Sequence, residues 1–184
     1  MNNMEIELRA KINDLKFLEK KLSQLENIYE TKSQERQVDT YFKHENDKDR
    51  KLIIRIRKNY KNKNTAILTF KSKAPKKQDD IAWQDFDTEI INPDKLENLL
   101  LDSGYDYYCL IDKVRQSFEY KKFEINIDNI RDLGQFIEVE KNGNEKEIVK
   151  IKSEILDLLK LLGINENNVI NKGYVQLVIN KINK

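Results

Sequence analysis

The sequence predicts an α+β fold in which about eight mostly antiparallel strands close, or nearly close, into a β-barrel accompanied by three or four helices. Two observations carry this prediction. About eight segments alternate between apolar and polar residues, and three or four others repeat apolar residues at helical spacing. Strict alternation indicates a strand with one buried face, and eight antiparallel strands are enough to close a small barrel.

The elements follow one another without a linker, an internal repeat or a second domain, so residues 1–184 are expected to form one domain. The first strand is predicted over residues 4–12, where Ile6 and Leu8 lie opposite Glu5 and Glu7. Further strands are predicted over residues 29–42, 52–58, 65–73, 81–91, 107–120, 123–130 and 135–141. The predicted helices are one capped at Asn13-Asp14 with Leu15, Leu18, Leu22 and Leu25 on one face, one opened by Pro93 and ended by Gly104, one over 145–162 ended by Gly163, and a short one from about 173. Polar connections are predicted over 44–51, 59–64 and 74–80.

Composition excludes several functional classes. Lys and Arg number 34 against 32 Asp and Glu, and such a balanced charge is unlike the one-sided excess of a nucleic-acid-binding surface. Apolar runs fall short of the roughly 20 residues that cross a bilayer, so no membrane partner is expected. Cys109 is the only cysteine, which rules out an intrachain disulfide, and the N-terminus lacks the pattern of a secretory signal. We therefore expect a cytoplasmic protein.

The polar faces of several strands carry paired charges of one sign. Residues two apart on a strand share a face, and the pairs are Glu5 with Glu7, Glu138 with Glu140, Arg55 with Arg57, Lys71 with Lys73, and Lys113 with Arg115. Two arrangements satisfy this pattern. In one, the apolar faces form the core and the charges are solvated outside; in the other, helices cover the apolar faces and the charges line a central tunnel.

A tunnel lined by both signs of charge would suit a polyanion held together with metal ions. Hard cations such as Mg²⁺ and Mn²⁺ take carboxylate and phosphate oxygens as ligands, and arginine and lysine bind phosphate. The chain has no Walker loop, no dinucleotide glycine motif and no histidine-based zinc pattern. Side chains, rather than a glycine-rich backbone, would therefore hold a triphosphate.

Six short motifs occur in the order found in a known family. They are Glu5-Ile6-Glu7-Leu8-Arg9 near E-x-E-x-K, Gln37 to Phe42 near Q-x-D-T-Y-F, Ile54-Arg55-Ile56-Arg57 near L-R-I-R, Leu68-Thr69-Phe70-Lys71 near L-T-[FY]-K, Asp128 with Leu133 to Glu140 near D-x(4)-L-G-x-F-x-E-[IV]-E, and Gly173 to Leu177 near S-Y-x-x-L. With these motifs the chain resembles the CYTH superfamily, the triphosphate tunnel metalloenzymes, and most closely its class IV adenylyl cyclases. Two positions depart from the pattern: Arg9 stands where the signature has Lys, and Trp83 stands where many relatives have Arg.

The resemblance implies an eight-stranded antiparallel closed β-barrel with a charged interior and helices packed outside, a homodimer, and Mg²⁺ or Mn²⁺ with two ions in each site. It implies conversion of ATP to 3′,5′-cyclic AMP and pyrophosphate by in-line attack of the 3′-oxygen on the α-phosphorus. The alternative is an inorganic tripolyphosphatase or thiamine-triphosphatase with water as the nucleophile. A non-catalytic polyphosphate- or nucleotide-binding module is a third reading, but it would be expected to lack the carboxylates.

The resemblance also assigns roles to individual residues. The expected metal ligands are Glu5, Glu7, Asp128, Glu138 and Glu140. The residues expected to bind the triphosphate are Arg9, Lys11, Arg55, Arg57, Lys71, Lys73 and Arg115. Lys11, Lys113 and Arg115 are expected to take part in catalysis, the two lysines as possible proton acceptors because nearby cations can lower the pKa of a lysine.

Overall fold

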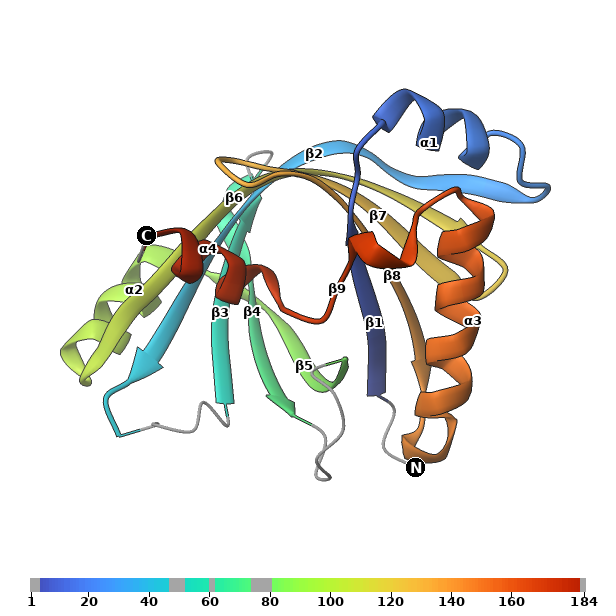
Figure 1. Cartoon of the computed structure of the whole chain (residues 1–184). Coiled ribbons are helices and arrows are strands. Elements are labelled where there is room, and N and C mark those ends of the chain that lie inside the picture. Colours follow the sequence, from blue (N-terminus) through green and yellow to red (C-terminus); the bar gives the residue numbers. More distant parts are fainter. Residues whose placement is uncertain (1–3, 47–51, 60–61, 74–80, 183–184) are drawn as a thin grey trace.

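A single antiparallel sheet curls round and closes on itself. The computed structural model describes residues 4–46, 52–59, 62–73 and 81–182. The strand order is β5-β4-β3-β2-β6-β7-β8-β1-β9, and β1 also pairs with β5 through Glu5 with Trp83 and Ile6 with Ala82 (Figure 1). Every pairing is antiparallel. The predicted closed antiparallel sheet is confirmed, with β9 added as a two-residue strand beside β1.

The elements lie close to their predicted positions. The strands are β1 (Met4–Lys11), β2 (Ile28–His44), β3 (Leu52–Asn59), β4 (Asn62–Lys73), β5 (Ala82–Ile91), β6 (Tyr105–Tyr120), β7 (Phe123–Ile130), β8 (Gly134–Gly143) and β9 (Val169–Ile170). The α-helices are α1 (Leu15–Leu22), α2 (Pro93–Asp102), α3 (Ile148–Leu161) and α4 (Tyr174–Ile182), and the 3₁₀ turns are η1 (Glu145–Glu147) and η2 (Glu166–Asn168).

Some boundaries differ from the prediction. The helix predicted from residue 145 begins as the 3₁₀ turn η1, because the side chain of Asn144 accepts from the backbone N–H of Lys146 and that of Glu147 accepts from the backbone N–H of Asn144. β3 and β4 each extend into the predicted turn over 59–64. Most of the connections predicted over 44–51 and 74–80 lie outside the described residues.

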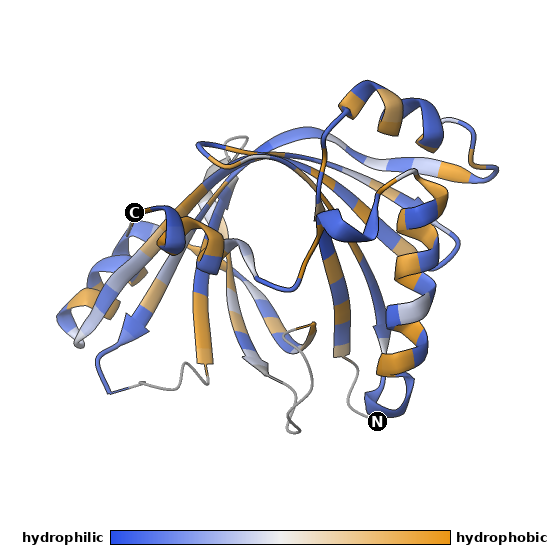
Figure 2. Ribbon diagram, in the orientation of Figure 1, coloured by the Kyte–Doolittle hydropathy of each residue, from blue (hydrophilic) through white to orange (hydrophobic). Residues whose placement is uncertain are grey.

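The main apolar core lies outside the closed sheet. Ile6 and Leu8 of β1 and Val139 of β8 are almost completely buried, and they pack against α3 through residues such as Ile155 and Leu159. Along the strands, apolar and polar residues alternate, as the orange and blue bands of Figure 2 show. Burial of each large aliphatic side chain stabilises the fold by roughly 1.5–3 kcal/mol. The outward-facing apolar residues therefore form the core, as the tunnel arrangement predicts.

A second cluster covers the opposite part of the sheet. Ile54 and Ile56 of β3 pack with Phe42 of β2, and the helix α2 covers them with Leu96 and Leu100. Ile54 and Ile56 therefore lie beneath a helix on the outside of the sheet, as the tunnel arrangement predicts. Within the described ranges, the structure contains no helix long and apolar enough to span a membrane.

The last helix, α4, packs differently from the other three. Tyr174, at its first residue, contacts Ile111 of β6, Ile130 of β7 and Phe136 of β8. Gly173 to Gln176, at the start of this helix, line the cavity inside the sheet, which α1, α2 and α3 do not. The predicted packing of helices outside the sheet is confirmed, and the N-terminal end of α4 in addition forms part of the cavity wall.

Candidate active site

The closed sheet surrounds a cavity of about 430 Å³. Most of the residues predicted for the site line this cavity. They are Glu5, Glu7 and Arg9 of β1, Arg55 and Arg57 of β3, Lys71 of β4, Lys113 and Arg115 of β6, and Glu138 and Glu140 of β8. Strand alternation explains the gathering, because each of these side chains lies on the face opposite the outer apolar core. The charges therefore line a lumen.

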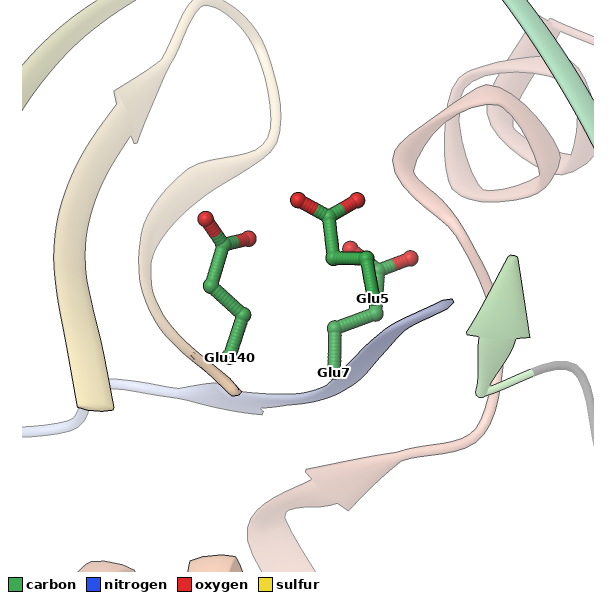
Figure 3. A group of neighbouring side chains, drawn as sticks. All are labelled: Glu5, Glu7 and Glu140. Carbon is green, nitrogen blue, oxygen red and sulfur yellow. The ribbon is translucent and has the colours of Figure 1, made fainter. Parts of the chain in front are cut away.

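Three carboxylates form an acidic corner, which we define as Glu5, Glu7 and Glu140. Carboxylate oxygens of the three lie within 4.8 Å of one another. Glu7 and Glu140 are directly opposite on β1 and β8, and the three side chains extend to the same side of these strands (Figure 3). Burial, and then the carboxylates of Glu5 and Glu138, raise the pKa of Glu140 well above its ordinary value.

The acidic corner fits a hard divalent cation. Mg²⁺ and Mn²⁺ are held by one or two carboxylates, with substrate phosphates and water completing the shell. The three carboxylates lie close enough together to bind one ion. A bound cation would also stabilise the ionised form of Glu140, whose pKa is raised in its absence. Glu5, Glu7 and Glu140 are therefore suited to hold the metal that the sequence predicted.

Glu138 differs from the acidic corner because two arginines hold it. Arg9 Nε lies 2.6 Å from one of its carboxylate oxygens, and Arg115 Nη2 lies 2.7 Å from the other. Arg9 also contacts Glu7 at 2.7 Å. Burial raises the pKa of Glu138, but Arg9 and Arg115 outweigh burial and hold it well below its ordinary value. Glu138 is thus an ionised carboxylate whose charge is already compensated.

Lys71 bridges the acidic corner to β5. Its Nζ lies 2.7 Å from both Glu5 Oε2 and Asp85 Oδ2. Burial lowers the pKa of Lys71, but Glu7, Glu5 and Asp85 together raise it above its ordinary value, so the ammonium remains charged. Burial also raises the pKa of Glu5, and Lys71 more than reverses this, whereas burial and Glu5 raise the pKa of Asp85 to about 7.

Arg55 and Arg57 approach the cavity from β3, each held by a neighbouring strand. Arg57 donates from Nε and Nη2 to the two oxygens of Asp39, at 2.7 and 2.8 Å. Arg55 donates from the same two atoms to Thr69 Oγ1, at 3.2 and 2.7 Å. Both arginines line the cavity. The geometry makes them fixed donors for an anion.

Arg115 and Lys113 occupy the β6 wall. Arg115 donates from Nε and Nη2 to Asp128, at 2.7 and 2.6 Å. Lys113 Nζ lies 3.6 Å from Asp128 Oδ2 and 5.6 Å from the centre of the Tyr174 ring. Burial, and then Arg115, lower the pKa of Lys113 to about 8, although Asp128 opposes the shift.

Two predicted residues do not line the cavity, and the side chain of a third is not described. Asp128 is completely buried behind Arg115, so its carboxylate is engaged by a cation rather than presented to a metal. Lys11 is exposed at the end of β1, where it pairs with Phe136 across the strands, beyond the cavity wall. The side chain of Lys73 lies outside the described part of the molecule, although its backbone pairs with Trp83.

Several residues of the cavity were not assigned to the site from the sequence. Glu124 of β7 lines the cavity and pairs in register with Glu140, which places it in a row with Glu7 across three strands. The sequence could have predicted this position, because Glu124, Asn126 and Asp128 alternate along β7 and so share one strand face. Asp85 also lines the cavity, but only the β4–β5 register brings it opposite Lys71.

Comparison with known proteins agrees with this architecture. The CYTH domain family model matches residues 3–174. A Methanocaldococcus jannaschii protein named "Putative adenylate cyclase" is 30% identical over 97 residues, and the match covers 51% of this chain and 54% of that protein, so the chain spans about half the length of this curated relative.

Solved structures show the same fold. A conserved hypothetical protein from Pyrococcus furiosus superposes with a TM-score of 0.81 at 23% identity, covering 94% of this chain and 99% of that one. A Hippeastrum protein, described as an adenylyl cyclase candidate with a dominant triphosphatase activity, gives a TM-score of 0.65 at 16% identity, covering 99% of this chain and 96% of that one. With the family match extending over nearly all of its length, the chain belongs to the CYTH domain family.

Proposed function

We propose that this protein is a divalent-metal-dependent enzyme that binds a triphosphate in its cavity, and that its reaction is the conversion of ATP to cyclic AMP and pyrophosphate. One observation carries the proposal: the acidic corner of Glu5, Glu7 and Glu140 shares one cavity with the cationic side chains of Arg55, Arg57 and other residues. A metal ion would neutralise the acidic half of such a cavity and a polyphosphate the basic half, whereas a nonpolar ligand would neutralise neither.

The two halves have different tasks. Glu5, Glu7 and Glu140 would hold Mg²⁺ or Mn²⁺, and the ion would supply neutralising charge for the phosphates and the attacking oxygen. Arg55 and Arg57 bind phosphate oxygens and are placed beforehand by Thr69 and Asp39. Donors that are already oriented stabilise the charge of a transition state without having to reorganise. Their catalytic effect arises from this preorganisation.

In the proposed cyclisation, the 3′-oxygen of the ribose attacks the α-phosphorus. The bond between the α-phosphorus and the oxygen that bridges the α- and β-phosphates breaks. Pyrophosphate leaves, and the 3′-hydroxyl proton passes to solvent or to a basic group of the cavity. Arg115 and Lys113 lie together on β6 and stabilise negative charge on the transferred group.

Triphosphate hydrolysis is the second candidate. It uses the same cavity with water as the nucleophile, and the description of the Hippeastrum structure as having a dominant triphosphatase activity favours it. The name of the M. jannaschii relative favours the cyclase. The two reactions share the binding of metal and triphosphate and differ in the phosphorus that is attacked. The homodimer expected from the resemblance is a further proposal, which sedimentation velocity tests.

The metal-holding role is tested by Glu5→Ala and Glu140→Ala. Each change should abolish turnover of ATP and tripolyphosphate while circular dichroism shows an intact fold, because neither side chain belongs to the outer apolar core. Glu19→Ala, an exposed glutamate on α1, is the matched control and should behave as the wild type. Near-normal rates of both cavity variants at saturating Mg²⁺ would mean that these carboxylates do not hold the metal.

A further inference from the structure

The three arginines that face the cavity from β3 and β6 are held in one common manner. Each donates from both Nε and Nη2 to the residue directly opposite it on the neighbouring strand. The pairs are Arg55 with Thr69, Arg57 with Asp39, and Arg115 with Asp128. Thr69, Asp39 and Asp128 are all at most 1% exposed and do not line the cavity, so each holds its arginine from behind.

This arrangement leaves one edge of each guanidinium available. Within the described ranges, no hydrogen bond engages Nη1 of Arg55, Arg57 or Arg115. A guanidinium has five N–H donors in a fixed plane, so fixing the Nε and Nη2 side also fixes the direction of the Nη1 donors.

One of the three partners carries no charge. Asp39 and Asp128 are carboxylates at 2.6–2.8 Å from their arginines, and they neutralise much of the positive charge. Thr69 is a hydroxyl, which orients Arg55 without compensating it. Among the described residues, the carboxylate within 4.0 Å of Arg55 is that of Asp87, whose side chain is 55% exposed. An exposed ion pair at that distance is worth little because water screens it. Asp39 also attracts Arg55, but it is bonded to the other arginine of β3.

We propose that Thr69 is a positioning residue that orients Arg55 while leaving its charge uncompensated, and that Arg55 therefore contributes more to triphosphate binding than either Arg57 or Arg115. The proposal rests on the proposed function, since it takes a triphosphate as the ligand. Its physical basis is that a charged donor in a buried site attracts a phosphate more strongly when no carboxylate competes for it.

The test removes the Thr69 hydroxyl while keeping the shape of the side chain. Thr69→Val should weaken binding of imidotriphosphate, a non-hydrolysable analogue, about tenfold in the presence of Mg²⁺, as measured by calorimetry. Thr69→Ser keeps the oxygen and should restore binding to within about twofold. Thr65→Val makes the same change on the same face of β4, at a residue that does not line the cavity, and should have no effect.

A double-mutant cycle distinguishes positioning from a structural role. If Thr69 acts through Arg55, the combined variant Arg55→Ala with Thr69→Val should bind no more weakly than Arg55→Ala alone. Arg55→Ala should also weaken binding more than Arg57→Ala or Arg115→Ala does. Should Thr69→Val fail to fold, Thr69→Ala removes the same hydroxyl without adding a methyl group and is measured in its place.

Four outcomes would overturn the proposal: additive losses in the cycle, a Thr69→Ser variant as weak as Thr69→Val, a Thr69→Val variant that binds like Thr65→Val, or an Arg55→Ala variant that binds no more weakly than Arg57→Ala or Arg115→Ala. In each of these cases the wild-type protein still binds imidotriphosphate with Mg²⁺, so the proposed function stands. A wild-type protein that does not bind the analogue would instead contradict the proposed function itself.

Discussion

Arg9 and Glu138 face each other across β1 and β8, with Arg9 Nε 2.6 Å from Glu138 Oε2. Arg115 contacts the same carboxylate, so Glu138 has two cations against it. Glu140, two residues further along β8, has instead the carboxylates of Glu5 and Glu7 as its neighbours. Two glutamates that look equivalent in the sequence therefore have opposite electrostatic surroundings, and substitution of each should have a different consequence.

Glu140→Gln should stabilise the metal-free protein. Because the folded-state pKa of Glu140 is raised, its stabilising contribution is present below the unfolded value near 4.5 and is lost as pH rises through the folded pKa. Glutamine is neutral at every pH, so in EDTA at pH 7.5 the variant should melt higher, by about 2–4 °C for each kcal/mol gained. The difference should shrink as the pH is lowered towards 4.5.

The same substitution should remove stabilisation by metal. Excess Mg²⁺ or Mn²⁺ should raise the Tm of the wild type, because an ion that binds only the folded state stabilises it. Glu140→Gln should show a much smaller rise, measured by differential scanning calorimetry. A variant less stable than the wild type in EDTA, with an unchanged response to metal, would contradict the assignment of the acidic corner.

Asp128→Asn should reduce turnover without changing metal affinity. Asp128 is completely buried and bonded to Arg115, so the change loosens the arginine rather than removing a metal ligand. We expect the apparent Kd for Mn²⁺, measured by calorimetry, to stay within about twofold of the wild-type value, which is about 0.4 kcal/mol. A loss of metal affinity as large as that of Glu140→Gln would return Asp128 to the metal ligands that the sequence predicted.

Arg57→Ala should lower kcat/KM by about 2–4 kcal/mol in transition-state free energy, the usual effect of losing one preorganised donor. The loss should be equal at every pH tested, since arginine does not release its proton in this range. Arg36→Ala is the matched control, because Arg36 pairs with Asp112 and does not line the cavity. A loss that varies with pH would indicate that Arg57 affects a titrating group instead.

Lys113→Arg tests whether Lys113 acts through its positive charge or as a base that accepts a proton. With a pKa of about 8, the neutral fraction of Lys113 grows as pH rises through 8. If Lys113 accepts the proton, the rate of the wild type should rise through this pH range and the arginine variant should lose that rise and most of its rate. We predict that charge suffices and that Lys113→Arg retains turnover within about tenfold, about 1.4 kcal/mol. A collapse of the rate with unchanged ATP binding would contradict this.

The sequence predicted well which residues line the cavity, but it did not predict which residue each of them contacts. Alternation alone assigns Glu5, Arg55 and Lys71 to inner faces, so these could be predicted. The contact between Lys71 and Asp85 depends on the register of β4 against β5, which alternation does not determine. The bond between Arg57 and Asp39 likewise depends on the register of β2 against β3, so alternation alone does not predict it.

Two further features depend on where the cavity ends. Lys11 lies on the same strand face as Glu5 and Glu7, but alternation gives the face and not the depth, and Lys11 falls beyond the cavity wall. The position of α4 was not predicted either. Its apolar residues Val175, Leu177 and Val178 suit either the outer surface or the inside of the sheet, and the structure places them against β6.

The central claim is that the cavity converts a triphosphate with the help of a divalent metal. The most direct measurement is ³¹P NMR of ATP, thiamine triphosphate and tripolyphosphate incubated with the protein in Mg²⁺ or Mn²⁺, with EDTA as the control. We predict metal-dependent loss of the ATP signals with the appearance of cyclic AMP and pyrophosphate; release of phosphate would identify the hydrolase instead. Unchanged spectra for all three compounds with both metals would contradict the account.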